Sequence, residues 1–128
     1  MRSDALKSLG MDPLARSVTD EQFLKLLAVW ELLRTRHREI PAQAVTVLLY
    51  VASHNPCHMQ AIENDLRLSP NSVSRNTDWL SKYHRLGKPG MGLVVKIADP
   101  VNARRRLVKL TEKGHRLVER INQILESP

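Results

Sequence analysis

The chain has 128 residues, with 20 Lys and Arg against 13 Asp and Glu, which gives a formal net charge of +7. This length suits one domain with a modest core, and an aromatic content of 4% means that aliphatic residues must fill most of that core. The excess of positive charge favours a polyanionic partner, with nucleic acid ahead of a membrane surface.

No apolar run approaches the roughly 20 residues that a transmembrane helix requires. Residues 1–18 also lack the continuous apolar segment of a secretory signal. The single cysteine, Cys57, has no partner for an internal disulfide, which agrees with a reducing compartment. We therefore expect a cytoplasmic protein that does not bind a membrane.

Residues 1–18 mix small, charged and turn-forming residues, and Gly10 with Asp12 and Pro13 interrupts any helix there. We predict a flexible N-terminal arm over residues 1–18, followed by one domain over residues 19–126. Basic residues of the arm could touch phosphate, although a frayed terminus is the commoner outcome.

A first helix is predicted from Thr19 or Asp20, because acidic residues stand in its first turn and its last residues, 34–38, are mostly basic. Its apolar side chains recur at helical spacing and form one face, which consists of Phe23, Leu26, Leu27, Trp30 and Leu33. This face either packs on its own domain or provides a dimer surface, and the pattern favours neither.

Pro41 is predicted to open a second helix, which Asn55 and Pro56 end. The buried stripe of this helix is expected to contain Val45, Leu48, Leu49 and Ala52. Residues 57–59 then form a brief extended link to the next helix.

His54, Cys57 and His58 lie close enough in sequence to raise a metal site or a reactive thiol as alternatives. A tetrahedral metal site normally needs a fourth ligand, and there is no second cysteine. No helix N-terminus or fixed cation is evident that would lower the pKa of the thiol, and the chain has no paired carboxylates or glycine-rich phosphate loop. We expect no metal, no cofactor and no enzymatic activity.

Residues 59–83 read as two short helices. Ile62 and Leu66 stand four apart on the first, and Ser69 followed by Pro70 supplies a capping residue and a favourable first position for the second. The second helix should bury one stripe, made of Val73, Thr77 and Leu80, and turn a polar face outward.

That polar face carries groups able to reach bases or phosphates: arginine bonds guanine in two places, asparagine does the same for adenine, and serine bonds either. The first turn also offers free N–H groups to a phosphate. The candidate DNA-binding residues here are Ser69, Asn71, Ser72, Ser74 and Arg75. The alternative is an ordinary amphipathic helix pair with a solvated polar face.

Residues 93–99 and 105–111 have the β-branched content of strands and are predicted to pair as a hairpin. The connection between them, residues 99–105, is too long for a tight two-residue turn and should project as a basic loop. Such a loop can place an arginine in the narrow minor groove of DNA. Its candidate DNA-binding residues are Asn102, Arg104, Arg105 and Arg106, and a solvated charge run is the alternative.

Thr111 is predicted to cap a last helix with Glu112 in its first turn. A broad apolar stripe follows, made of Leu117, Val118, Ile121, Ile124 and Leu125. This stripe must pack on its own domain or on the first helix of a second subunit.

Three segments resemble the multiple-antibiotic-resistance regulator (MarR) family over roughly residues 20–126. LSPNSVSRNTDWLSK is similar to the recognition segment of that family, and DPVNARRRLVKLTEKG is similar to its wing, including the ending Leu110, Thr111 and Gly114. IPAQAVTVLLYVA resembles the preceding helix, with Gln43 in the usual place. The chain departs from the family in having Glu63, Asn102 and Ala103, a longer entry to the wing, and one C-terminal helix where many members have two.

The resemblance implies a mainly α fold with a small β-hairpin wing, a single winged helix-turn-helix domain. It implies a dimeric transcription regulator that binds double-stranded DNA at a palindromic operator through Asn71, Ser72, Ser74 and Arg75, with Arg104 in the wing. We expect a repressor that acts as a homodimer, and the shortened C-terminus leaves a small-molecule effector open. The expected dimerisation residues are Phe23, Leu27, Trp30, Ile121 and Leu125. A winged-helix interaction or replication-associated module with little sequence specificity is the alternative.

Overall fold

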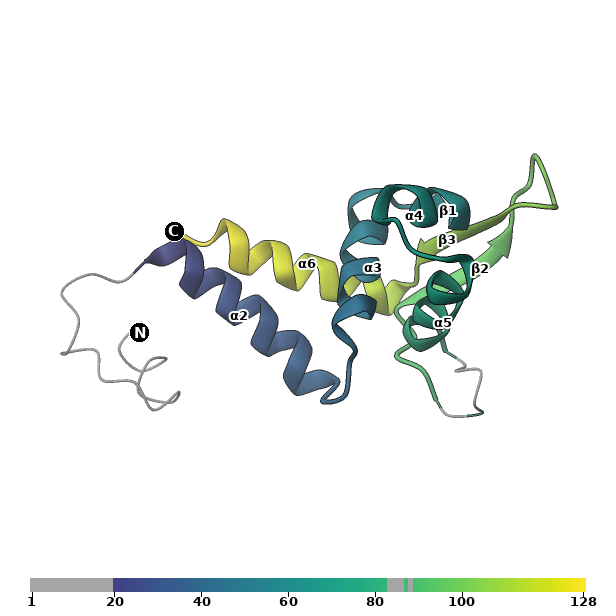
Figure 1. The fold of residues 1–128 in the computed structure, drawn as a ribbon. Coiled ribbons are helices and arrows are strands. Elements are labelled where there is room, and N and C mark those ends of the chain that lie inside the picture. The colour runs from purple at the N-terminus through teal and green to yellow at the C-terminus, as the bar shows by residue number, and fades with distance from the viewer. Residues whose placement is uncertain (1–19, 83–86, 88) are drawn as a thin grey trace.

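A computed structural model describes residues 20–82, 87 and 89–128 (Figure 1). The predicted N-terminal arm and part of the glycine-rich turn that follows the recognition segment therefore lie outside the described residues. The helices are α2 (Glu21–Arg36), α3 (Ala42–Ser53), α4 (Met59–Leu66), α5 (Pro70–Leu80) and α6 (Glu112–Glu126). The strands are β1 (Cys57–His58), β2 (Val94–Ala98) and β3 (Arg106–Leu110), so the predicted mainly α fold with a β wing is confirmed.

Local capping explains why three helices begin where the sequence predicted. The Asp20 carboxylate accepts from the backbone N–H groups of Gln22 and Phe23 at the start of α2. The Ser69 hydroxyl accepts from Ser72 N at 3.1 Å, and the Thr111 hydroxyl from Gly114 N at 3.0 Å. Each cap satisfies N–H groups that have no partner within the helix itself.

The three strands form one antiparallel sheet in the order β1-β3-β2. β2 and β3 are the predicted hairpin, with Val94 opposite Leu110 and Ala98 opposite Arg106. β1 adds to the other edge of β3, so the predicted extended link is a short third strand. The loop between β2 and β3 projects away from the body as the wing (Figure 1).

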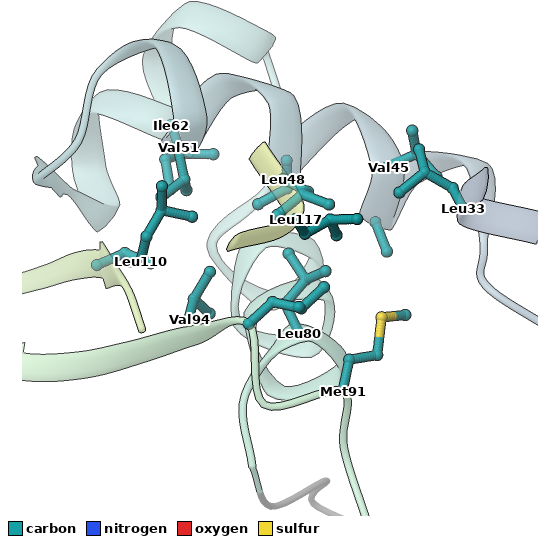
Figure 2. Close-up of a cluster of buried hydrophobic side chains, with 14 of the residues drawn as sticks. Leu33, Val45, Leu48, Val51, Ile62, Leu80, Met91, Val94, Leu110 and Leu117 are labelled. Carbon is teal, nitrogen blue, oxygen red and sulfur yellow. The ribbon is translucent and has the colours of Figure 1, made fainter. Parts of the chain in front are cut away.

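An aliphatic core joins α3, α4, α5 and α6 to the sheet (Figure 2). Leu48, Ile62, Leu80 and Leu117 are almost completely buried in it. The predicted stripe of α3 was wrong at Leu49, which is 45% exposed. α3 packs against α5 and β3, and its buried residues are Ala44, Val45, Val47, Leu48 and Val51.

α2 and α6 lie side by side and form a two-helix arm that extends away from the sheet, with the wing at the opposite end of the molecule (Figure 1). Lys25 Nζ donates to the Leu125 carbonyl oxygen at 3.1 Å near the end of this arm. Val29 and Leu33 are the buried residues of α2. Among the described residues, no helix has both the length and the apolar character needed to cross a membrane.

The predicted single apolar face of α2 is divided between two environments. Leu33 is buried and Leu27 is half-buried, whereas Phe23 is 70% and Trp30 is 47% exposed. α2 packs against α6, and the apolar side chains of Phe23, Leu26 and Trp30 remain at the surface of the single chain.

Candidate nucleic-acid interface

The outer face of α5 is set by what its inner face buries. Val73, Thr77 and Leu80 are fully buried, as the sequence predicted. Asn76 is buried as well, at 6% exposure. Its Nδ2 donates to Gln43 Oε1 at 2.7 Å and to the Ser72 carbonyl oxygen at 2.9 Å, so both amide hydrogens are used.

Sequence reasoning missed Asn76. Its place three residues after Val73 and four before Leu80 is the signal that puts it on the buried face. The hydrogen bond to Gln43 joins α5 to the first turn of α3 and fixes which side chains of α5 turn outward.

The predicted residues of α5 divide into two groups. Asn71 and Arg75 are exposed, and the side chain of neither makes a hydrogen bond or ion pair with another described residue. Ser69 and Ser72 are engaged locally, because the Ser69 hydroxyl donates to Ser72 Oγ at 3.0 Å while it caps the helix. Ser74 is half-buried. The long side chains available to a ligand are therefore those of Asn71 and Arg75.

Hydrogen bonds within the wing loop give it a defined shape. Asp99 N donates to the Arg105 carbonyl oxygen at 3.0 Å, and Arg105 N donates to the Asn102 carbonyl oxygen at 2.9 Å. Asn102 Oδ1 accepts from Arg104 N at 3.2 Å. The Asn102 side chain, a candidate DNA contact, thus holds the turn that presents the arginines.

Arg104, Arg105 and Arg106 are all exposed. Within the described part of the chain, their guanidinium groups form no hydrogen bond or ion pair. Three adjacent cations without acidic partners create a strongly positive surface on the wing.

α5 and the wing meet at one hollow on the surface. Ser74 of α5 and the three wing arginines line one hollow of about 400 Å³. α4 and β1 supply the other walls, through His58, Met59, Gln60 and Glu63. Of these, His58 and Glu63 are titratable residues that sequence reasoning did not place beside the wing.

Two polar pairs connect the wing to the rest of the domain, one to α5 and one to β1. The Lys96 ammonium group of β2 is paired with the Asp78 carboxylate of α5, and both side chains are largely buried. His58 Nε2 lies 2.8 Å from Asp99 Oδ2 at the wing base. The hydrogen bond from His58, with the backbone N–H of Val101, lowers the pKa of Asp99 below its ordinary value.

The region around Cys57 offers no reactive site. Cys57 is buried at the edge of the sheet, and burial raises the pKa of its thiol to about 11. Across residues 20–82, 87 and 89–128, no three His, Cys, Asp or Glu side chains gather as metal ligands would.

The predicted dimerisation residues lie on the arm but do not share one environment. Phe23, Trp30 and Leu125 are exposed, and Leu27 is half-buried. Ile121 is only 6% exposed and packs within its own chain. The exposed apolar surface of the arm therefore consists of Phe23, Leu26, Trp30 and Leu125.

No protein-family model and no curated protein matches the chain. Several solved structures are similar to it. A MarR variant from E. coli in complex with operator DNA is 21% identical, with 83% of this chain and 66% of that chain covered and a TM-score of 0.58. Transcriptional regulator Tm0710 from Thermotoga maritima is 17% identical over 81% and 66%, with a TM-score of 0.63. A MarR-like transcriptional regulator, tm0816, from the same organism is 26% identical over 86% and 77%, with a TM-score of 0.59.

The chain spans about two thirds of the length of the first two structures. In each of the three, the alignment covers more than four fifths of this chain, so it includes most of the helices and strands described above. The chain has a MarR-like winged helix-turn-helix fold.

Proposed function

We propose that this protein is a sequence-specific, double-stranded DNA-binding transcription regulator, a cytoplasmic homodimer that represses by occluding a palindromic operator. The observation that carries the proposal is that Ser74 of α5 and Arg104–Arg106 of the wing line one hollow. A helix and a loop that open to one side can engage neighbouring grooves of one duplex.

The α5 helix is the proposed reader of the major groove. That groove is about 12 Å wide and admits one α-helix. Arg75 and Asn71 are exposed and have no partner among the described residues, so their donors are available to base edges. Because Asn76 and Gln43 fix the rotation of α5, the same two side chains should face the bases in every complex.

The wing is the proposed contact to the adjacent minor groove. A narrow minor groove concentrates negative potential and attracts arginine. Arg104 follows the tip of a loop held by its own hydrogen bonds, which reduces the ordering that binding would require. Arg105 and Arg106 are assigned to the flanking phosphates, where they add affinity for any sequence.

The homodimer is proposed from the arm. Phe23, Trp30 and Leu125 are large apolar side chains exposed on α2 and α6. Burying such side chains between two copies would contribute about 1.5–3 kcal/mol for each one fully buried. Two-fold symmetry would make the site an inverted repeat, and to read two half-sites one DNA turn apart the two α5 helices would need to lie about 34 Å from one another. E. coli MarR, which has this fold, crystallised with operator DNA, and this supports the proposal.

The test is selection of bound duplexes from a random pool, with the mass of the complex measured alongside. The proposal predicts enrichment of one inverted repeat, bound by two chains, and an affinity that falls steeply with salt. Placing that repeat across a promoter should then lower transcription in a purified system when the protein is added. Salt-dependent binding without an enriched sequence would contradict the proposal and favour a nonspecific interaction module.

A further inference from the structure

One carboxylate, that of Asp99, holds the base of the wing from two directions. Its Oδ2 bonds His58 Nε2 at 2.8 Å, and its Oδ1 accepts from Val101 N at 2.9 Å. The backbone N–H of Asp99 donates to the Arg105 carbonyl oxygen at 3.0 Å. The Asp99 side chain is 12% exposed and the His58 side chain is 39% exposed, so the bond between them is only partly shielded from water.

The bond to His58 spans the whole sheet. His58 lies on β1 opposite Leu107 of β3, and Leu107 lies opposite Ile97 of β2. Asp99 stands two residues after Ile97, and residues two apart share a face of a sheet. The imidazole and the carboxylate therefore meet across the central strand at the wing base, and they connect the wing to the strand that leads directly into α4.

Charged groups of both signs surround His58. Asp99 bonds it directly, Glu63 of α4 lines the same hollow, and the cations of the hollow are Arg104, Arg105 and Arg106. A positive charge on the imidazole strengthens the bond to Asp99 but is repelled by the three arginines. DNA phosphates in the hollow would neutralise the arginines and favour the charged imidazole.

We infer that His58 positions the wing through Asp99 and makes DNA binding stronger as the pH falls. The part of this inference that concerns DNA binding rests on the proposed function. Histidine changes its charge between about pH 5 and pH 8. If binding favours the charged imidazole, then binding takes up a proton, and by linkage a lower pH must tighten binding.

The test compares three proteins on the duplex enriched from the random pool, at constant ionic strength. Between pH 8 and pH 6, the affinity of the wild type should rise at least about threefold, and the upper limit is about 100-fold, since uptake of one proton gives at most about tenfold per pH unit. H58Q can still donate to Asp99 but cannot become charged. Its affinity for the duplex should therefore equal that of the wild type at pH 8 and should not increase at pH 6. H115Q makes the same exchange on the exposed surface of α6, outside the hollow, and should retain the rise.

A second measurement needs no DNA. In the free protein, the amide NMR signals of Val101 and Arg104 should shift with pH in the wild type and in H115Q. In H58A, which removes the donor to Asp99, the same signals should move to new positions and lose most of that pH dependence.

The outcomes separate this inference from the proposed function. If no duplex binds the wild type but the NMR signals respond as described, the regulator proposal fails, and the role of His58 in positioning the wing stands. If DNA binds and H58Q shows the same rise in affinity as the wild type, the pH response does not come from His58. If the wing signals are unchanged in H58A, the positioning role is overturned.

Discussion

Asn76 Nδ2 donates a 2.7 Å hydrogen bond to Gln43 Oε1, and this bond joins the buried face of α5 to the first turn of α3. The two residues are 33 positions apart in the sequence. A helix that reads DNA must hold a fixed rotation about its own axis, because a small rotation would carry Arg75 away from the base edge proposed for it. A specific polar bond fixes this rotation more precisely than aliphatic packing alone.

The Gln43→Ala substitution should lower the free energy of unfolding by about 1–3 kcal/mol, because it leaves a buried amide donor of Asn76 without its partner. Urea titration measures the change. Gln60→Ala is the matched control, since Gln60 is also an exposed second residue of its helix, but its side chain makes no hydrogen bond with another described residue. An equal loss in both variants would mean that the bond contributes nothing of its own.

The Gly114→Ala substitution should destabilise the fold by about 3 kcal/mol, which is large for a change of one methyl group. A Cβ atom at this position would lie 2.1 Å from the Leu93 carbonyl oxygen, and that oxygen already accepts from Thr111 N. Urea unfolding tests the effect against His115→Ala, an exposed neighbour on α6, which should change stability by less than about 0.5 kcal/mol. A well-tolerated Gly114→Ala would show that α6 can move away from the Leu93 carbonyl group with little loss of stability.

The features that could be predicted from the sequence are those set by local chemistry. Asp20, Ser69 and Thr111 cap helices through N–H groups two or three residues away, so their helix starts were predictable. The exposure of Arg75 and of the wing arginines follows in the same way from their spacing on a helix and in a loop.

The features that could not be predicted depend on residues distant in the chain. Leu49 and Trp30 belong to apolar stripes, but which side of a helix is covered depends on the elements that pack against it. The bond between His58 and Asp99 joins residues 41 positions apart, and no local pattern signals it.

Native Cys57 should react very slowly with iodoacetamide. Burial raises the pKa of its thiol to about 11, so at pH 8 only about one molecule in a thousand carries the reactive thiolate. The rate should rise about tenfold for each pH unit up to pH 11, and unfolding in urea should increase it sharply at pH 8. Cys57 is the single cysteine of the chain, so a mass shift reports on it alone. Rapid labelling of the folded protein at pH 8 would contradict the buried position.

Arg75→Ala and Arg105→Ala should weaken DNA binding in different ways. Arg75→Ala should cost about 1–3 kcal/mol on the preferred duplex and relax the preference at one base pair, because Arg75 is assigned to a base edge. Arg105→Ala should weaken all duplexes alike and reduce the salt dependence, because Arg105 is assigned to phosphate.

Competition binding with a set of single-base variants of the preferred duplex separates these two effects. Arg120→Ala, on the exposed surface of α6, is the control for loss of one positive charge far from the wing and should leave affinity nearly unchanged. Equal losses on every duplex for Arg75→Ala would refute its role as a base reader.

Trp30→Lys should convert the proposed dimer to a monomer. Trp30 lies 47% exposed on the arm, and a large aromatic residue at the centre of an interface often contributes at least about 2 kcal/mol. Two-fold symmetry brings the change into the interface twice, for a loss of about 4 kcal/mol, so the dimer dissociation constant should rise by about 700-fold. Sedimentation equilibrium over a range of concentrations measures this constant.

Leu49→Lys is the matched control for that experiment. Leu49 is 45% exposed and apolar, but it lies on α3 outside the arm, so the introduced lysine adds the same charge at a different surface. The control should remain a dimer and bind the inverted repeat as the wild type does. Trp30→Lys should bind one half-site with much lower affinity, because the second α5 helix is no longer held on the same duplex. If both variants sediment as the wild type does, Trp30 does not hold the two copies together, and the dimer, if there is one, uses another surface.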